Sequence, residues 1–234
     1  MRAILVDWLI EVHYKFKFQP PTLWLCINIL DRYLEIAQTS RSDLQLVGVA
    51  SLLIACKFEE IRPPEVRDCV YITDYAYSRE QVLNMESKIL KQLDYQLCIP
   101  TGFHFMTRYL NFLNASDQLR YLSFYYAERN LQEYDMLNIP PHQFVAASLF
   151  AALNFRDKDL SEKTHSLWTL ELTELTGYSE AEVFPYSVTI LQHVQEETVT
   201  ASRRQLIAAK KKYAAEKYNS ISSLPVPVLS NEKR

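Results

Sequence analysis

The chain has 234 residues, of which 48% are hydrophobic and only 3 are glycine, and its formal net charge is −3. This length leaves room for two domains with packed cores, and so few glycines exclude a glycine-rich phosphate loop. The negative charge argues against broad nucleic-acid binding. No apolar stretch is long enough for a membrane helix. Asp7 and Glu11 interrupt the first apolar run, so it is not predicted to be a signal peptide.

The four cysteines predict buried free thiols. Cys26, Cys56, Cys69 and Cys98 are 30, 13 and 29 residues apart, with no CxxC pair, and they lie in apolar segments. Such placement is more typical of small buried side chains than of zinc ligands or disulfides. It fits a reducing compartment.

The chain begins with two predicted helices. Residues 1–12 carry Ile4, Leu5 and Trp8 at helical spacing, which predicts an amphipathic helix. The paired prolines at positions 20 and 21 then mark the start of a second helix, expected to run to about residue 37, because proline suits the first turn of a helix.

Residues 42–60 predict a helix that is buried on every side. In its central part only Gly48 and Ser51 are not plainly apolar, whereas a surface helix would show one apolar stripe. Gly48, Ser51 and Ala55 share one face, where another helix can approach closely. Ser42 is the predicted N-cap.

The same buried stretch occurs twice. Val47–Phe58 aligns with Phe144–Phe155 at an offset of 97, and five of the twelve positions are identical. Two further matches keep the chain order, with 31–34 on 128–131 and 77–82 on 178–183. Three collinear matches predict two tandem helical units of about a hundred residues, each around its own buried helix.

Capping and stop signals predict the remaining helices. In the first unit, Pro63-Pro64-Glu65 opens a short helix, and Ser78 opens another that ends near Leu93. A linker at 96–101 precedes helices near 102–113, 117–132, 141–154, 160–176 and 179–195. A basic helix over about 202–218 is expected to expose Lys210–Lys212 to solvent, and residues 221–234 are expected to be extended.

No segment alternates with the period of a strand, so the predicted fold is all-α. It consists of two tandem five-helix units and a C-terminal helix with its tail, with boundaries at 1–97, 98–198 and 199–234.

Several stretches of the first unit form an ordered set: residues 1–11 (MRAILVDWLIE), Leu44–Gly48, Lys57–Glu60, Pro63–Glu65, Tyr71–Asp74 and Met85-Glu86. Together these stretches resemble the A- and B-type cyclins. The chain is similar to a mitotic B-type cyclin, and residues 99–105 and 131–135 lean toward the third B-type class. The fold that this implies, two cyclin boxes, agrees with the repeat. The chain begins inside the first helix of the box, so we expect an N-terminally truncated member.

The resemblance implies a non-catalytic regulatory subunit, without cofactor or metal, found in nucleus and cytoplasm. It would bind and activate a cyclin-dependent kinase at the G2/M transition by seating the ion pair that kinases need to position phosphate. The implied kinase-contact set is Lys57, Phe58, Glu86, Leu90 and Tyr95. The implied docking patch, for substrate or inhibitor peptides of the Arg-x-Leu type, is Met1, Ile4, Leu5, Trp8, Glu11, Leu44 and Gln45.

Other interpretations stay open at this point. The stripe of Ile4, Leu5 and Trp8 could simply be buried, and so could the apolar members of the kinase-contact set. Asp7 and Arg32 could form an internal salt bridge. The five histidines show no metal-ligand spacing, and no catalytic serine motif is present. Alternative functions are a DNA-binding transcription-factor core built from the same repeat and a kinase-independent scaffold.

Overall fold

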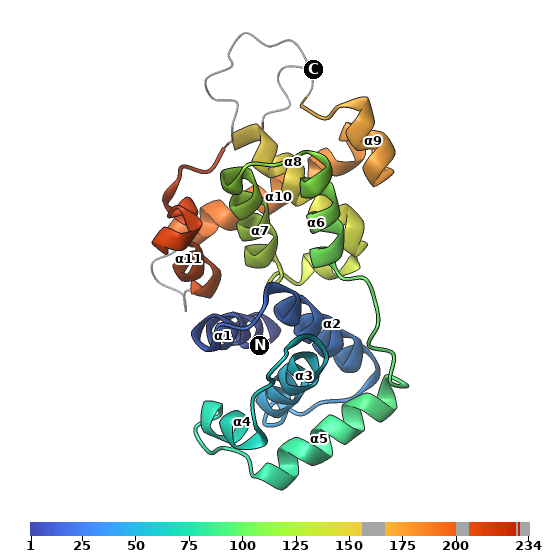
Figure 1. Ribbon diagram of the computed structural model, residues 1–234, viewed down its shortest axis with the longest axis vertical. Helices are drawn as coiled ribbons and strands as arrows, with labels where there is room; N and C mark the ends of the chain where they lie inside the picture. The colour runs from blue at the N-terminus through green and yellow to red at the C-terminus, as the bar shows by residue number, and fades with distance from the viewer. Residues whose placement is uncertain (156–166, 200–205, 228, 230–234) are drawn as a thin grey trace. The chain divides into compact units, whose positions relative to one another are not determined.

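All regular structure in the described part of the chain is helical. The computed structural model describes residues 1–155, 167–199, 206–227 and 229, which form two compact units, Met1–Phe103 and His104–Arg234 (Figure 1). The prediction of an all-α fold is confirmed. None of the helices in these residues is long and apolar enough to cross a lipid bilayer.

The first unit is built around its third helix. Helix α3 is buried over every residue from Leu46 to Cys56, and it packs against each of the other four helices (Figure 1). The five helices are α1 (Arg2–Phe16), α2 (Pro20–Ile36), α3 (Leu44–Glu59), α4 (Val66–Ile72) and α5 (Arg79–Gln92). The predicted all-round burial of this helix is therefore confirmed.

Gly48 lets α1 approach α3 closely. A Cβ atom at this position would lie 2.7 Å from Leu5 Cδ1, closer than carbon atoms pack. Leu5 itself is only 6% exposed, so it fills the space that a larger residue 48 would occupy. Helix α1 thus packs on the predicted small-residue face of α3 at Gly48.

The start signals of the helices are confirmed at Pro20 and Ser78 but not at Ser42. Ser78 and Gln81 form a reciprocal capping box, and two prolines fill the first turn of α2. Asp43, not Ser42, holds the N-cap position of α3. The Ser42 hydroxyl instead lies 2.7 Å from that of Ser40, whose Oγ accepts the Asp43 N–H, so the turn before the helix uses these polar groups.

The second half of the chain repeats this plan. Helix α8 is buried from Phe144 to Ala152 and packs against α7 and α10, as α3 packs against α2 and α5. The elements are α6 (Gly102–Phe112), α7 (Asp117–Asn130), η1 (Asp135–Asn138), α8 (Pro141–Phe155), α9 (Leu170–Thr176) and α10 (Glu180–Val199). Part of the helix expected at 160–176 lies outside the described residues, and the described part begins at Leu170.

The C-terminal helix is shorter than predicted. Only Ala208–Tyr213 (α11) is α-helical, followed by the 3-10 turns Glu216–Tyr218 (η3) and Ile221–Ser223 (η4), while 202–205 lie outside the described residues. Positive φ angles at Asn219 and Ser220 reverse the chain and return η4 to α7. Ile221 is consequently 1% exposed, so the prediction of an extended tail is wrong at its first residues.

Lys212 is buried, which corrects the prediction of a solvated lysine run. It is 3% exposed, and its Nζ donates to Glu128 Oε2 at 2.6 Å, while the Tyr213 hydroxyl donates to Glu128 Oε1 at 3.0 Å. Both donors are needed because a buried carboxylate without partners is strongly unfavourable. Burial, reinforced by the Glu128 carboxylate, raises the pKa of Tyr213 well above its usual value.

Lys212→Met is predicted to destabilise the chain by about 3–5 kcal/mol, because it leaves the buried Glu128 carboxylate without its cation. Lys211→Met, at the exposed neighbour on the same helix, is the matched control and is expected to change stability by less than about 0.5 kcal/mol. Urea unfolding of both variants measures the difference. Equal stability of the two would contradict the assigned ion pair.

The cysteine prediction is confirmed for three thiols and wrong for one. Cys26, Cys56 and Cys69 are buried, whereas Cys98 is exposed in the segment after α5. Burial raises the pKa of all three buried thiols, to about 12 for Cys69. The thiolate is the reactive form, so these groups are protected by both burial and protonation.

A thiol-specific reagent at pH 8 is therefore predicted to modify one thiol of the native chain rapidly and all four after denaturation. Cys98→Ser should abolish the rapid phase, as measured by absorbance of the released chromophore. A rapid phase that persists in this variant would show that a cysteine placed in the core is accessible.

Candidate functional site

The fold brings the five residues of the kinase-contact set to neighbouring positions on the first unit. Lys57 and Phe58 lie in the last turn of α3, Glu86 and Leu90 lie one turn apart on α5, and Tyr95 follows that helix. Lys57 Nζ donates to Glu86 Oε1 at 2.5 Å. Its side chain is 47% exposed and that of Glu86 11%, so the pair is open to a partner on one side.

A tight turn after α5 places Tyr95 next to Leu90. Asp94 and Tyr95 have φ angles of 49° and 56°, and the Tyr95 N–H donates to the Leu90 carbonyl at 2.9 Å. A left-handed conformation is uncommon for a residue as bulky as tyrosine, and such strain persists only where the surroundings enforce it. The turn leaves the Tyr95 ring 63% exposed.

Two apolar side chains lie next to the members of the charge pair on their own helices, Phe58 directly after Lys57 and Leu90 one turn after Glu86. Phe58 is 49% exposed and Leu90 is partly buried, so the alternative that Phe58 and Tyr95 belong to the core is wrong. Ile61, which the sequence reasoning missed, is 99% exposed two residues after Glu59. The sequence signal for its exposure was its position between the charged residues Glu60 and Arg62, in a segment that ends in two prolines.

Glu60 holds the end of α3 against the start of α2. Its Oε1 accepts the Gln19 N–H at 2.7 Å and the Thr22 hydroxyl at 2.6 Å. The carboxylate thus binds at the N-terminus of α2, where the helix dipole favours negative charge. Glu60 therefore has a structural partner, and its contact fixes the position of the neighbouring Lys57 and Phe58.

The second repeat has no equivalent of this charge pair. Asn154 aligns with Lys57 at the offset of 97, and Ser187 aligns with Glu86 at the offset of 101. The Asn154 amide donates to the Phe150 carbonyl of its own helix, and the buried Ser187 hydroxyl lies 2.8 Å from the Ala147 and Val183 carbonyls. The repeat therefore folds without an ion pair here, which favours a binding role for the pair in the first unit.

The docking patch gathers on α1 and the first turn of α3. Met1 and Ile4 are 58% and 38% exposed, Glu11 is exposed, and Leu44 and Gln45 are partly buried. Leu5 is buried against Gly48, so it supports this surface from below and does not line it.

Trp8 is half-buried at the edge of the patch. It packs against a core cluster that includes Leu46, Val49 and Leu53. The alternative that the stripe of Ile4, Leu5 and Trp8 is buried is therefore correct for Leu5 and partly correct for Trp8. Arg32 donates a hydrogen bond to the Gln96 carbonyl at 2.7 Å, and its pairing with Asp7 stays a prediction.

Arg2 holds the helix that carries the patch. Its guanidinium binds both carboxylate oxygens of Asp31, at 2.6 and 2.7 Å, and so joins α1 to α2. This bidentate pair is 12% and 23% exposed at its two side chains, and it was not predicted. Bidentate contacts of this kind fix orientation as well as adding energy.

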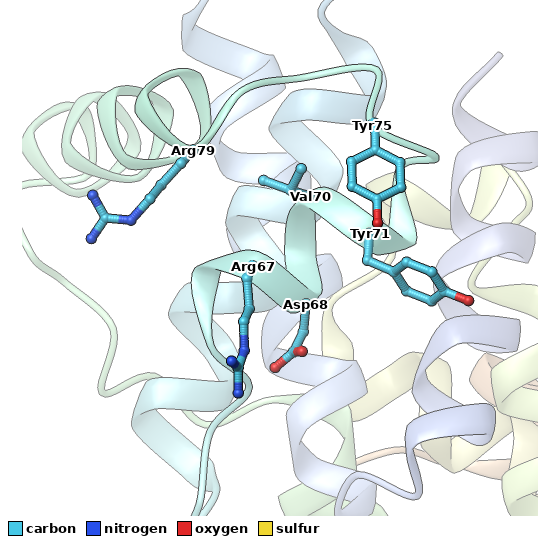
Figure 2. Close-up of a pocket in the computed structure, with 6 residues that line it drawn as sticks. All are labelled: Arg67, Asp68, Val70, Tyr71, Tyr75 and Arg79. Carbon is cyan, nitrogen blue, oxygen red and sulfur yellow. The ribbon is translucent and has the colours of Figure 1, made fainter.

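A cavity of about 360 Å³ opens beside α4. Figure 2 shows the guanidinium groups of Arg67 and Arg79 pointing apart, with the rings of Tyr71 and Tyr75 on the other side of Val70. Arg67 is already paired with Glu65, and Asp68 caps the N-terminus of α4. The charged groups do not converge on a point, so the cavity is not the predicted site.

Two domain families match the chain in tandem. Residues 1–98 match the cyclin N-terminal domain, and residues 100–227 match the cyclin C-terminal domain. The boundary between the two matched segments falls close to the predicted boundary between the two units, and the second segment runs to residue 227, past the predicted end of the second unit at 198.

B-type cyclins are among the relatives found by sequence. Cyclin-B1-4 of Arabidopsis thaliana is 40% identical over 227 residues, covering 96% of this chain and 56% of that protein. G2/mitotic-specific cyclin-B2 of Homo sapiens is 38% identical over 229 residues, covering 96% and 54%. The chain thus spans about half the length of the curated relatives it matches. The third B-type class stays a prediction.

Solved structures share the fold. The crystal structure of a viral cyclin from Herpesvirus saimiri superposes with a TM-score of 0.71 at 23% identity, covering 83% of this chain and 84% of that one. A chain of the yeast RNA Pol II CTD kinase CTDK-1 complex gives a TM-score of 0.67 at 16% identity, covering 98% and 77%. With both domain families matched in order and B-type relatives over nearly its full length, the chain belongs to the cyclin family.

Proposed function

We propose that the chain is a regulatory subunit that binds and activates a cyclin-dependent protein kinase and controls the G2/M transition. The observation that carries this proposal is the Lys57–Glu86 pair, 47% and 11% exposed at its two side chains, with exposed Phe58 next to Lys57 and exposed Tyr95 in the turn after α5. Relatives over 96% of the chain include one named a G2/mitotic-specific cyclin. The subunit itself supplies no catalytic group, needs no cofactor and acts in nucleus and cytoplasm.

The kinase contact follows from the character of this surface. Exposed aromatic side chains around a charge pair are typical of interface centres, where the surrounding apolar contacts exclude water. A partner that covers Lys57 and Glu86 removes the solvent that screens them, so each charge then depends on the other and on groups of the partner. The turn at Asp94 and Tyr95 fixes the backbone from which the exposed Tyr95 ring projects.

The docking patch, from which buried Leu5 is now excluded, is proposed to recruit substrates. Met1 and Ile4 offer exposed apolar surface, and Glu11 adds a negative charge at the rim. A short peptide with a leucine and an arginine suits such a surface, because the apolar side chain is buried and the cation faces the acid.

Lys57→Ala combined with Glu86→Ala is predicted to weaken kinase binding by roughly 2–5 kcal/mol, as expected when a charge pair buried at an interface is lost. The same change should cost the free chain less than about 1 kcal/mol, because Lys57 is half-exposed there. Calorimetric titration with a purified cyclin-dependent kinase measures the binding, and urea unfolding measures the stability.

Lys88→Ala is the matched control for this experiment. Lys88 is exposed on α5 and lies two residues from Glu86, about 200° around the helix, so it faces away from the pair. A folded double variant that binds the kinase as tightly as this control would contradict the proposed interface. That outcome would favour a kinase-independent scaffold, and salt-dependent binding of a DNA duplex would favour a transcription-factor core.

Trp8→Ala is predicted to reduce phosphorylation of substrates that carry an Arg-x-Leu motif and to spare a short peptide without it. Because Trp8 also packs on the core, this variant should lose some stability. Ile4→Glu, at a 38% exposed position, should reproduce the selective loss with an intact core. Steady-state kinase assays on the two substrates measure the ratio, and an equal loss on both would show that Trp8 is only structural.

A further inference from the structure

Three potential metal ligands come together in the second unit. They are Glu133, Asp135 and His193, and their donor atoms all lie within 4.8 Å of one another. Glu133 and Asp135 follow the end of α7, and His193 lies on α10. The sequence separates His193 from Asp135 by 58 positions, so no spacing rule could have joined them.

A buried asparagine fixes the orientation of the histidine ring. The Asn130 amide nitrogen lies 2.9 Å from the Tyr126 carbonyl and 3.3 Å from the Ile190 carbonyl, so it must donate to both. Its oxygen therefore faces His193 Nδ1, 2.7 Å away, and can only accept. Nδ1 consequently carries a hydrogen, so it is Nε2, on the other side of the ring, whose lone pair can bind a cation.

That lone pair faces another acceptor. Asp135 Oδ2 lies 3.5 Å from His193 Nε2, longer than a good hydrogen bond. Two acceptors at this separation suit a shared cation, since two ligand atoms about 2.0–2.2 Å from a tetrahedral Zn²⁺ are roughly 3.3–3.6 Å apart. A histidine whose other nitrogen donates to a fixed oxygen is the arrangement that protein metal sites use to orient this ligand.

Arg129 positions the third ligand. Its guanidinium binds Glu133 Oε1 at 2.5 Å and donates to the His193 carbonyl at 3.1 Å. The contact holds the Glu133 carboxylate next to His193 and leaves the second oxygen available, although the arginine charge lowers the affinity for a cation. A hydrogen-bonded carboxylate is also common among metal ligands.

We propose that Glu133, Asp135 and His193 bind a divalent transition-metal ion, with Zn²⁺ as the best match for one imidazole and two carboxylates. Water would complete the coordination. Since Asp135 is exposed, the ion can enter from solvent. The site lies in the second unit and is independent of the proposed kinase contact.

The test is titration of the metal-depleted, untagged full chain with Zn²⁺ by calorimetry, and with Co²⁺ by visible absorption. A Cys98→Ser background removes the one exposed thiol. We expect saturation at one ion per chain and a Co²⁺ spectrum of tetrahedral type without thiolate bands. Asp135→Asn should raise the apparent dissociation constant at least about tenfold, as removal of even a supporting group does in metal sites.

Glu174→Gln, an exposed acid on α9 of the same unit, is the matched control and should bind like the parent. His193→Gln should abolish the Co²⁺ spectrum. This change removes a contact with buried Asn130, so if the His193→Gln variant misfolds, the exposed Asp135→Asn variant decides the outcome. Absence of saturable Zn²⁺ binding, or unchanged affinity in folded Asp135→Asn, would overturn the proposal.

Discussion

The first unit depends on one constraint, which is that α3 is apolar around its whole circumference and must be covered on every side. Its four neighbouring helices meet this demand, and the Gly48 notch that admits Leu5 lets α1 lie close enough to take part. Such a helix can contribute to function only at its ends. The docking patch includes its first turn, and the kinase-contact set includes its last turn, so both predicted surfaces follow from the burial of the same helix.

Two Lys–Glu pairs differ in burial, and this difference separates a structural pair from the pair in the predicted kinase-contact set. Glu128 and Lys212 are almost fully buried, and a second hydrogen bond to Glu128, from Tyr213, completes the network that ties α11 to α7. Lys57 and Glu86 are partly open to water and contribute little to stability until a partner covers them. The second repeat has Asn154 and Ser187 at the positions equivalent to Lys57 and Glu86, and it keeps the same fold without this ion pair.

The range of an interaction along the chain decides whether it could be predicted from the sequence. Helix positions followed from apolar periodicity and from caps such as Ser78, because these signals act within a few residues of chain. Errors occurred where contacts over long sequence distances decide the outcome. The Lys210–Lys212 run was predicted to be solvated because the partner of Lys212, the Glu128 carboxylate, lies 84 residues earlier in the chain. Ile221 looked frayed because its burial depends on a turn at Asn219 and Ser220.

The sequence by itself therefore determined the helical class and the two repeats with their buried central helices, while the resemblance to the cyclins supplied the residues of the two predicted surfaces. Only the tertiary structure decided which of these side chains face solvent, since a helical stripe such as Ile4, Leu5 and Trp8 reads the same whether it is covered or not. It also decided pairings between distant segments, such as Arg2 with Asp31 and His193 with Asp135. The physical reason is that burial and charge pairing depend on neighbours in space, whereas periodicity and capping depend on neighbours in the chain.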